Sequence, residues 1–377
     1  MNLPALDRPA FVLDEAAFRQ NLSLIADVAA RADVEIILAL KAFANWRAFG
    51  IVAEYLPSAT ASSLNEALLV ARHMGVPPHV YAPAYVPSEW ERLADTGSHF
   101  TFNSLGELER YRERWESRGL SVGLRVNPLY GPVATALYNP ASPVSRLGES
   151  VAGLPTDPPR GLSGVHVHTL CESSAEQTAE LIARVEQDLA GWLPRLRWLN
   201  LGGGHLMTRE DYDLELLVAE LRGLRRRHPH LAVTLEPGSA HAWRAGVLVA
   251  HVLDIIANGG VETLMLDVSF TCHMPDTLEM PYRPVVRGAS AEAIDGHHPY
   301  RLGGTSCLAG DYLEAYFFPE RVSVGDQLVL EDMLHYTTVK STMFNGVAHP
   351  DFAVLRPGGE LEITRRFDFA DYEARMG

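Results

Sequence analysis

Short runs of β-forming residues alternate with longer amphipathic stretches over about the first two thirds of the chain. Eight of these runs are candidate strands, at residues 35–40, 59–63, 79–83, 99–103, 121–126, 163–168, 197–202 and 232–237. The stretches between most of them, such as SLNEALLVARHMG, have the apolar spacing of helices that bury one face. Strands that alternate with helices form parallel sheets with helical crossovers. Eight such units predict an α/β fold, a (β/α)8 TIM barrel, because an open doubly wound sheet seldom holds so many.

The pattern changes at about Ala245, where β-like runs follow one another without long helical periods between them. These runs are GVLVAHVLDII, TLMLDVS, YRLGG and DQLVLED, and Gly, Pro and Asp residues separate them. A chain of 377 residues also exceeds the roughly 250–300 residues that one hydrophobic core usually serves. The sequence therefore predicts a second, C-terminal, mainly β domain of sandwich or β-barrel type.

Composition and charge narrow the class of protein. The N-terminus lacks a basic region followed by an apolar one, and no run of about 18 apolar residues occurs, so we expect no signal peptide and no membrane span. Three cysteines without CxxC spacing argue against a disulfide framework or structural zinc and favour the reduced cytoplasm. The net charge of −15 disfavours nucleic acid as a partner and is compatible with a cationic substrate.

Reactive side chains gather where the predicted strands end, which is where β/α barrels have their active sites. These residues are Lys41, Arg125, His166, His168, Gly202, Gly203, Gly204 and Glu236. Lys41 follows the apolar run IILAL, so burial should lower the pKa of its amine, as a Schiff-base lysine requires. The alternative is an ordinary lysine in contact with water at the end of a strand.

Three more features have both a chemical and a structural interpretation. The triple glycine follows the seventh strand, where barrels often bind phosphate through backbone N–H groups, although it can also be a simple turn. Glu236 can keep a pyridine nitrogen protonated, which makes the ring a stronger electron sink, or can form a surface salt bridge. His166 and His168 point to the same side of one strand, so at least one should reach the site unless both are core residues.

Longer motifs carry a resemblance to a known family. The stretches are LALKAFA, TASSLNE, GVHVHTLCES, LNLGGGH, EPG, DVSFTCHMPDTLEMPYRP, GGTSCLAGD and MLHYTTVKSTMFNGV. In this order they resemble the fold-type III pyridoxal-phosphate (PLP) decarboxylases, the alanine racemase-like barrel enzymes that act on ornithine, arginine, diaminopimelate or carboxynorspermidine. SCLAGD, CHMPD and TMFNG are more similar to the branch of carboxynorspermidine/carboxyspermidine decarboxylases than to the others.

The resemblance implies a cofactor, PLP, and a role for each matching residue. Lys41 would bind the cofactor covalently, and His168 would stack on its ring. The other cofactor contacts would be Glu236 at the pyridine nitrogen, Arg125 on the side of the phenolic oxygen, and Gly203, Gly204 and Tyr336 at the phosphate. It also implies a barrel over residues 15–240 and a mainly β domain made of residues 1–14 and 241–377.

The resemblance further implies a homodimer with shared active sites. Cys307 and Asp311 would enter the site of the partner subunit, where Cys307 would supply a proton and Asp311 would help to bind a substrate amine. Asp276 and Glu279 remain available for a long, multiply charged amine, with ordinary loop carboxylates as the alternative. No metal ligand is implied.

Two departures bear on the substrate. Ser239 stands where the ornithine and diaminopimelate branches usually have a basic residue, and Leu308 stands where they have an acidic one. We therefore expect decarboxylation of carboxynorspermidine to norspermidine, or of carboxyspermidine to spermidine, in polyamine biosynthesis. The alternatives are a diaminopimelate-, ornithine- or arginine-type decarboxylase, a metal-dependent barrel hydrolase that uses the HxH pair, and a cofactor-binding protein without activity.

Overall fold

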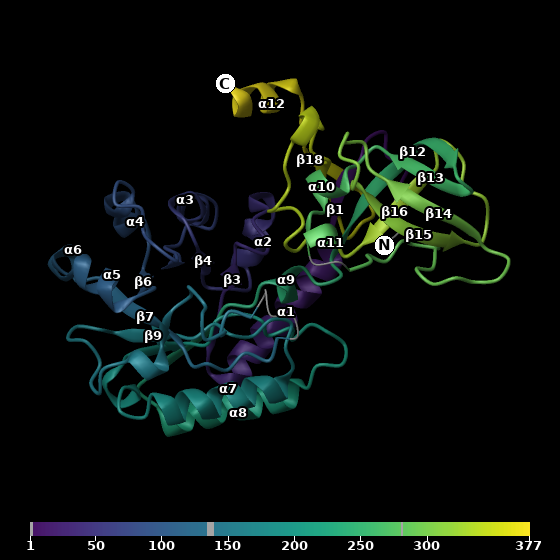
Figure 1. Cartoon of the computed structure of the whole chain (residues 1–377). Helices are drawn as coiled ribbons and strands as arrows, with labels where there is room; N and C mark the ends of the chain where they lie inside the picture. The colour runs from purple at the N-terminus through teal and green to yellow at the C-terminus, as the bar shows by residue number, and fades with distance from the viewer. Residues whose placement is uncertain (1–2, 134–138, 280–281) are drawn as a thin grey trace. The chain divides into compact units, whose positions relative to one another are not determined.

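The computed structural model describes residues 3–133, 139–279 and 282–377, and the chain divides into two compact units. One unit is Asn21–His241, called here the barrel unit, and the other combines Met1–Gln20 with Ala242–Gly377, called the β unit. Among the described residues, no helix is long and apolar enough to cross a membrane. Figure 1 shows the elements of both units along the chain.

The barrel unit is built on a parallel sheet. Its strands are β2 (Glu35–Ile36), β3 (Leu38–Ala39), β4 (Ala59–Ala61), β5 (His79–Tyr81), β6 (His99–Phe102), β7 (Ser121–Asn127), β8 (Glu149–Ser150), β9 (Gly164–His166), β10 (Trp198–Asn200) and β11 (Ala232–Leu235). The order β2-β11-β10-β9-β7-β6-β5-β4-β3 leaves β8 as a short addition to β7. Since β2 and β3 are consecutive pieces of one run, with β2 paired to β11 and β3 to β4, the sheet is a nearly closed barrel.

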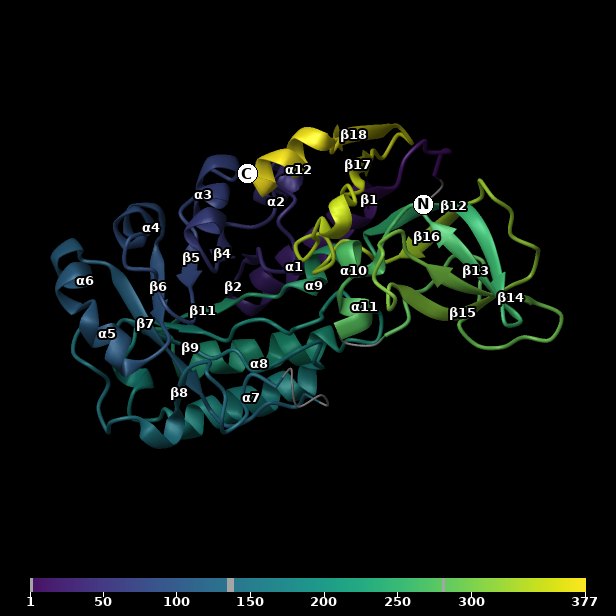
Figure 2. The ribbon, with the colours of Figure 1, turned by 45° about the horizontal axis from the view of Figure 1, so that its top comes forward.

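The predicted barrel is thus confirmed: seven of the eight predicted runs contain their observed strand or strand pair, and the eighth, 121–126, ends one residue before β7 does. The alternating helices are α1 (Glu15–Ala32), α2 (Phe49–Ala53), α3 (Leu64–His73), α4 (Trp90–Thr96), α5 (Leu105–Arg110), α6 (Arg112–Arg118), α7 (Ala175–Asp188), α8 (Leu214–Arg227) and α9 (Ser239–Ala242). Side-chain caps fix where several of them begin: the Ser63 hydroxyl accepts the Glu66 amide, and the Asp213 carboxylate accepts the Leu216 amide. Helices α7 and α8 lie side by side, as both views show (Figure 2).

The β unit is a mixed sheet with the order β15-β14-β13-β12-β1-β17-β18, and β16 pairs with β12. Its strands are β1 (Ala10–Asp14), β12 (Gly246–Asn258), β13 (Val261–Leu266), β14 (His298–Gly303), β15 (Tyr312–Phe318), β16 (Gln327–Glu331), β17 (Asp351–Leu355) and β18 (Leu361–Arg365). The N-terminal strand β1 joins this sheet between β12 and β17, and Val12, Val249 and Ala353 form part of one buried cluster. Among its described residues, the unit also has the short helices α10 (Phe270–His273), α11 (Asp276–Glu279) and α12 (Phe369–Met376).

Candidate active site

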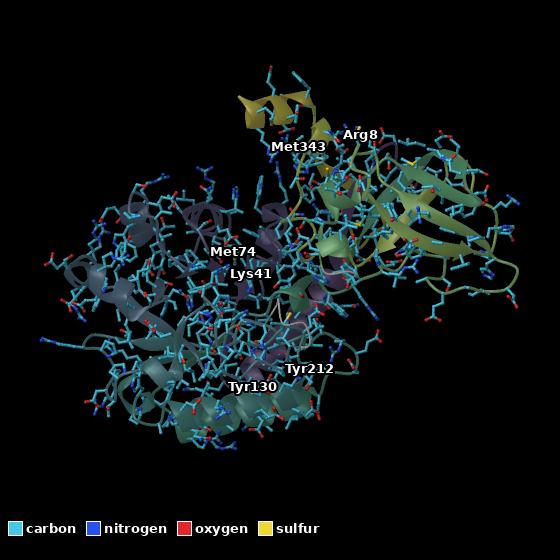
Figure 3. The ribbon with its side chains drawn as sticks, viewed as in Figure 1. Arg8, Lys41, Met74, Tyr130, Tyr212 and Met343 are labelled. Carbon is cyan, nitrogen blue, oxygen red and sulfur yellow. The ribbon has the colours of Figure 1, made fainter. Side chains whose placement is uncertain are left out.

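The predicted cofactor residues of the barrel unit lie at the carboxyl ends of its strands. Lys41 follows β3 (Figure 3), Arg125 lies in β7, and His168 follows β9. Gly203 and Gly204 follow β10, and Glu236 follows β11 directly. Because parallel strands point the same way, these side chains share one end of the barrel.

Lys41 and His168 are in direct contact. The Lys41 Nζ atom lies 3.2 Å from His168 Nε2, and His168 Nδ1 accepts the backbone N–H of Gly203 at 2.6 Å. A neutral imidazole that accepts at Nδ1 carries its proton on Nε2 and donates there. In this arrangement the His168 Nε2–H group faces the Lys41 amine, which accepts the hydrogen bond in its unprotonated form.

The electrostatics of the site favour the same state. The Lys41 side chain is accessible to solvent, but surrounding protein atoms strip most of the hydration from its amine. This burial, together with the positive charge of Arg125, lowers the pKa of Lys41. Burial also holds the pKa of His168 well below its usual value. A neutral amine beside a neutral imidazole is a nucleophile prepared for a carbonyl carbon.

Arg125 is the fixed cation of the site. Its side chain is buried, its Nη2 atom donates to the backbone carbonyl of His168 at 3.0 Å, and its guanidinium lies 4.7 Å from the centre of the Tyr81 ring. Burial lowers the pKa of Arg125, but a guanidinium in a protein stays charged. The Tyr81 hydroxyl in turn donates to Asn103 Oδ1 at 2.8 Å, which fixes the ring that the Arg125 guanidinium contacts.

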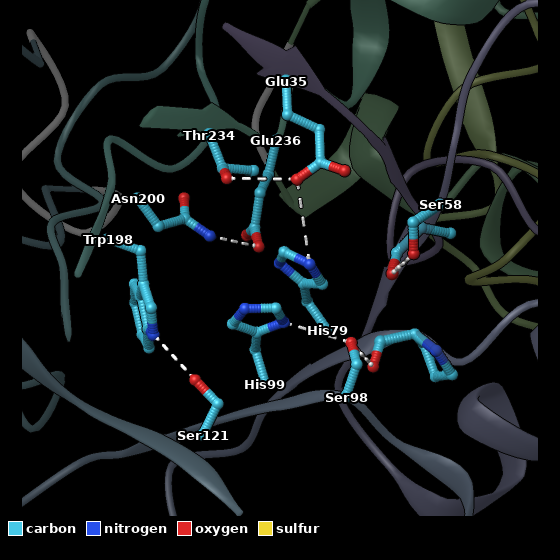
Figure 4. A network of polar contacts seen from close by, with 12 residues as sticks. Glu35, Ser58, His79, Ser98, His99, Ser121, Trp198, Asn200, Thr234 and Glu236 are labelled. Carbon is cyan, nitrogen blue, oxygen red and sulfur yellow. Dashed lines mark hydrogen bonds and ion pairs between the residues drawn. The ribbon is translucent and has the colours of Figure 1, made fainter. Parts of the chain in front are cut away.

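Glu236 is a buried acid that accepts a hydrogen bond from Asn200. Its side chain lies within the barrel, where Asn200 Nδ2 donates to Oε1 at 2.7 Å (Figure 4). The second carboxylate oxygen, Oε2, is 3.6 Å from His166 Nε2, too far for a hydrogen bond. Burial raises the pKa of Glu236, and the Asn200 hydrogen bond acts against that shift. Neither ring nitrogen of the buried His166 has a hydrogen-bond partner among the described residues.

The glycine loop after β10 approaches backbone on two sides. A Cβ atom on Gly203 would lie 2.4 Å from the Glu236 carbonyl oxygen, and one on Gly204 would lie 2.2 Å from the Leu170 carbonyl carbon. Gly202 and Gly204 also have φ of +67° and +92°, a region that side chains disfavour. The loop therefore needs glycine at these positions, and its amides lie beside His168 and Glu236.

Sequence reasoning missed several residues of this site. Asn200 orients Glu236, Tyr81 supports Arg125, and Thr60 contributes a hydrogen bond that lowers the pKa of Glu236. Glu66, whose carboxylate accepts the Ser62 amide at 2.6 Å, interacts electrostatically with Lys41. The signal for three of them was a polar residue within a short apolar strand, in ATA, HVY and WLN.

The other predicted site residues, Cys307, Asp311, Tyr336, Asp276 and Glu279, belong to the β unit. Cys307 is exposed and Asp311 is buried. Asp276 and Glu279 stand at the two ends of α11, and both accept hydrogen bonds from Lys340 Nζ. The acidic pair predicted to face a substrate amine thus already has a cationic partner.

Residues 10–333 match the family described as "Pyridoxal-dependent decarboxylase, C-terminal sheet domain". The chain belongs to this family. A decarboxylase of Synechocystis named carboxyaminopropylagmatine decarboxylase is 47% identical to this decarboxylase over 100% of the chain and 97% of its own length. The carboxynorspermidine/carboxyspermidine decarboxylase of Campylobacter jejuni is 35% identical over 98% of both chains.

Solved structures agree with the fold. The crystal structure of a Campylobacter jejuni carboxynorspermidine decarboxylase complexed with norspermidine superposes with a TM-score of 0.90 at 34% identity, over 98% of this chain and 100% of the other. A Helicobacter pylori diaminopimelate decarboxylase complexed with L-lysine, at 17% identity and a TM-score of 0.81, shows the fold alone.

The expectations of a fold-type III decarboxylase, of lyase activity and of PLP as the cofactor are confirmed, and the metal-dependent hydrolase is ruled out. The geometry of the barrel unit fits this cofactor. It offers a lysine amine in contact with an imidazole, a buried carboxylate held by Asn200, and a glycine loop into which no side chain fits.

Proposed function

We propose that this decarboxylase removes the carboxylate from a carboxylated polyamine, leaving an aminopropyl group. The observation that carries this proposal is its likeness, over nearly its whole length, to relatives at 47%, 35% and 33% identity whose names all describe such substrates. Carboxynorspermidine, carboxyspermidine and carboxyaminopropylagmatine share one end, an aminopropyl group that carries the carboxylate beside its amine. They differ in the far arm.

The first candidates are carboxynorspermidine, which would give norspermidine, and carboxyspermidine, which would give spermidine. Carboxyaminopropylagmatine is a second candidate because the relative of that name has the highest of these three identities. The far arm is a three-carbon or four-carbon amine in the first two and ends in a guanidinium in the third. All three are cations, in keeping with the net charge of −15.

The cofactor contacts proposed for this chain follow the barrel geometry. Lys41 would bind the carbonyl carbon, and Glu236 would contact the pyridine nitrogen. His168 would lie on one face of the ring, and Arg125 would lie on the side of the phenolic oxygen. The phosphate would be bound by Gly203, Gly204 and Tyr336. Bound PLP supplies the electron sink for the bond that releases CO₂. Because the Gly203 amide already donates to His168, the Gly204 amide is the better phosphate donor of the two glycines.

Side chains of this decarboxylase would then stabilise charge on the bound ring and transfer a proton. An ionised Glu236, held by Asn200, favours a proton on a bound ring nitrogen, which strengthens the pull on electrons from the breaking bond. Arg125 adds a fixed positive charge beside the ring. Cys307 of the partner subunit of a homodimer would return a proton to the carbon that lost CO₂, and its exposed thiol on a surface loop supports that role.

Parallel assays test the proposal. The purified protein with added PLP would be given carboxynorspermidine, carboxyspermidine, carboxyaminopropylagmatine, meso-diaminopimelate, ornithine and arginine, with amine products measured. We expect turnover of the carboxylated polyamines only, with kcat/KM ranking the far arms, and Lys41→Ala should abolish both turnover and the cofactor absorption band. Turnover of diaminopimelate, ornithine or arginine instead would overturn the substrate class. Cofactor binding without any turnover would favour a protein that has lost activity.

A further inference from the structure

The carboxylate of Asp311 is occupied by its own surroundings in the β unit. Oδ1 accepts the Thr271 amide at 2.9 Å, and Oδ2 accepts both the Ser306 amide at 3.1 Å and the Ser306 hydroxyl at 2.6 Å. Only 4% of the residue is exposed. An ionised carboxylate has about four acceptor positions, so three of them are already in use.

The loop that carries Cys307 closes around this carboxylate. The Gly304 amide donates to the Asp311 carbonyl at 2.7 Å, and the Asp311 amide donates to the Leu308 carbonyl at 3.0 Å. A Cβ atom on Gly304 would lie 2.4 Å from Asp311 Oδ2, so the backbone reaches the carboxylate only because glycine stands there. Cys307 lies on the exposed side of this closed loop.

A second side chain holds Cys307 from another segment. The Cys307 amide donates to Asn345 Oδ1 at 2.8 Å. Asn345 has φ of +58°, in the left-handed region that asparagine tolerates better than most residues. The backbone is thus held at two points on the N-terminal side of the Cys307 Cα atom: Asp311 holds Ser306, the residue before Cys307, and Asn345 holds the amide of Cys307 itself.

We propose that Asp311 and Asn345 are positioning residues for the Cys307 thiol, and that Asp311 is not a ligand for a substrate amine. The proposal rests on the proposed function in one respect, that Cys307 is the proton donor. An exposed side chain on a loop has many orientations available, and each one away from the reacting carbon lowers the rate. Hydrogen bonds to an ionised acceptor are the stronger kind, which suits Asp311 to this task.

The test follows the reactivity of Cys307 in the holoenzyme without substrate. Iodoacetamide labelling, read by peptide mass spectrometry, reports each cysteine separately, with exposed Cys171 and buried Cys272 as internal references. The variants are Asp311→Asn, Asn345→Gly and Asn345→Asp. Asn345→Asp keeps an oxygen that can accept the Cys307 amide and tolerates the positive φ at this position. Asn345→Gly tolerates the positive φ but has no such oxygen. Asp326→Asn is the control, since Asp326 also accepts a loop amide in the β unit, from Ser323 at 2.8 Å.

We expect Asp311→Asn and Asn345→Gly to change the Cys307 labelling rate at least several-fold and to lower kcat by about tenfold to 100-fold with KM nearly unchanged. Asn345→Asp and Asp326→Asn should behave like the wild type. In a protein that already carries Cys307→Ala, adding Asp311→Asn should lower kcat little further. A higher KM for the polyamine with unchanged kcat and labelling would show instead that Asp311 binds substrate and would overturn the proposal.

Two features keep this test decisive. If Asp311→Asn fails to fold, the pair Asn345→Gly and Asn345→Asp still asks whether the acceptor at Cys307 matters, and equal labelling in the two would overturn the role of Asn345. The labelling needs no substrate, so an enzyme that turned over none of the candidate polyamines would refute the proposed function and leave the labelling result standing by itself.

Discussion

His168 connects the Lys41 amine, 3.2 Å from its Nε2 atom, to the Gly203 amide, 2.6 Å from its Nδ1 atom. The imidazole therefore links Lys41, where we propose that the cofactor binds, to the glycine loop after β10. A hydrogen bond from its Nε2–H to the Lys41 amine favours the unprotonated form of that amine.

Two substitutions separate the contacts of His168. A glutamine side chain can keep the donor to Lys41, and an asparagine side chain can keep the acceptor for Gly203. His168→Asn should raise the pKa of Lys41, so that the rate at which the apoenzyme forms the cofactor band falls and its dependence on pH moves to more alkaline values. His168→Gln should shift this profile less. Stopped-flow absorbance across pH measures both, and identical profiles for the two variants would contradict this account.

Glu236→Gln should lower kcat and raise the melting temperature of the apoprotein. Removing the negative charge at the ring nitrogen should lower kcat by about 10²–10³-fold. Burial raises the pKa of Glu236 in the folded state, so the stability that its protonation provides is lost as pH rises through that raised value. A neutral glutamine avoids this loss, so apo Glu236→Gln should melt above the wild type at neutral pH.

The pH dependence supplies the control for this prediction. Below the usual glutamate pKa of 4.5 both forms are uncharged, and the difference in melting temperature should vanish. Calorimetry of the apoproteins between acid and neutral pH measures it. A wild type that is the more stable form at neutral pH would contradict the prediction.

Gly204→Ala should damage the cofactor site. The new Cβ atom would lie 2.2 Å from the Leu170 carbonyl carbon, and the left-handed φ of +92° adds strain. We expect a loss of about 1–3 kcal/mol in the free energy of unfolding and much weaker PLP binding. Gly153→Ala is the matched control because nothing lies within 4 Å of its Cβ position. Chemical denaturation and PLP titration of both variants would measure this, and equal behaviour would refute the steric argument.

Lys340→Gln tests whether the acidic pair on α11 meets the substrate. Burial acts to lower the pKa of Lys340, but its bonds to Asp276 and Glu279 raise it on balance, so the lysine is a charged competitor for those carboxylates. If Asp276 and Glu279 bind the far amine, Lys340→Gln should lower KM about twofold to fivefold at low salt and less at high salt. Arg301→Gln, which releases Glu314 elsewhere in the β unit, should leave KM unchanged. An unchanged KM for Lys340→Gln would make the pair structural.

Much of this molecule could be predicted from local pattern. Each of the eight runs predicted as strands overlaps a strand or strand pair of the barrel, because burial on both faces leaves β-branched and apolar residues in sequence. Lys41, Arg125, His168 and Glu236 could be found because a parallel barrel brings the residues at and just after the ends of its strands together, whatever their separation along the chain. Position after a strand was thus sufficient to identify them as candidates.

Partners and hydrogen bonds could not be predicted in this way. From the sequence, Asp311, Asp276 and Glu279 were predicted to be available for a cationic substrate. In the tertiary structure Asp311 accepts hydrogen bonds from Ser306 and Thr271. Asp276 and Glu279 form ion pairs with Lys340. Asn200 escaped notice, although it orients Glu236 across 36 positions of sequence.

The sequence by itself determined the order of elements, the family and the residue types at each strand end, because these depend on local periodicity and on motifs of a few residues. Only the tertiary structure decided which polar groups satisfy one another, because a hydrogen bond depends on atoms brought within about 3 Å by the packing of distant segments. The same distinction applies to Lys41. Its identity as the lysine after the first strand is local, whereas its lowered pKa comes from burial and from the nearby charge of Arg125.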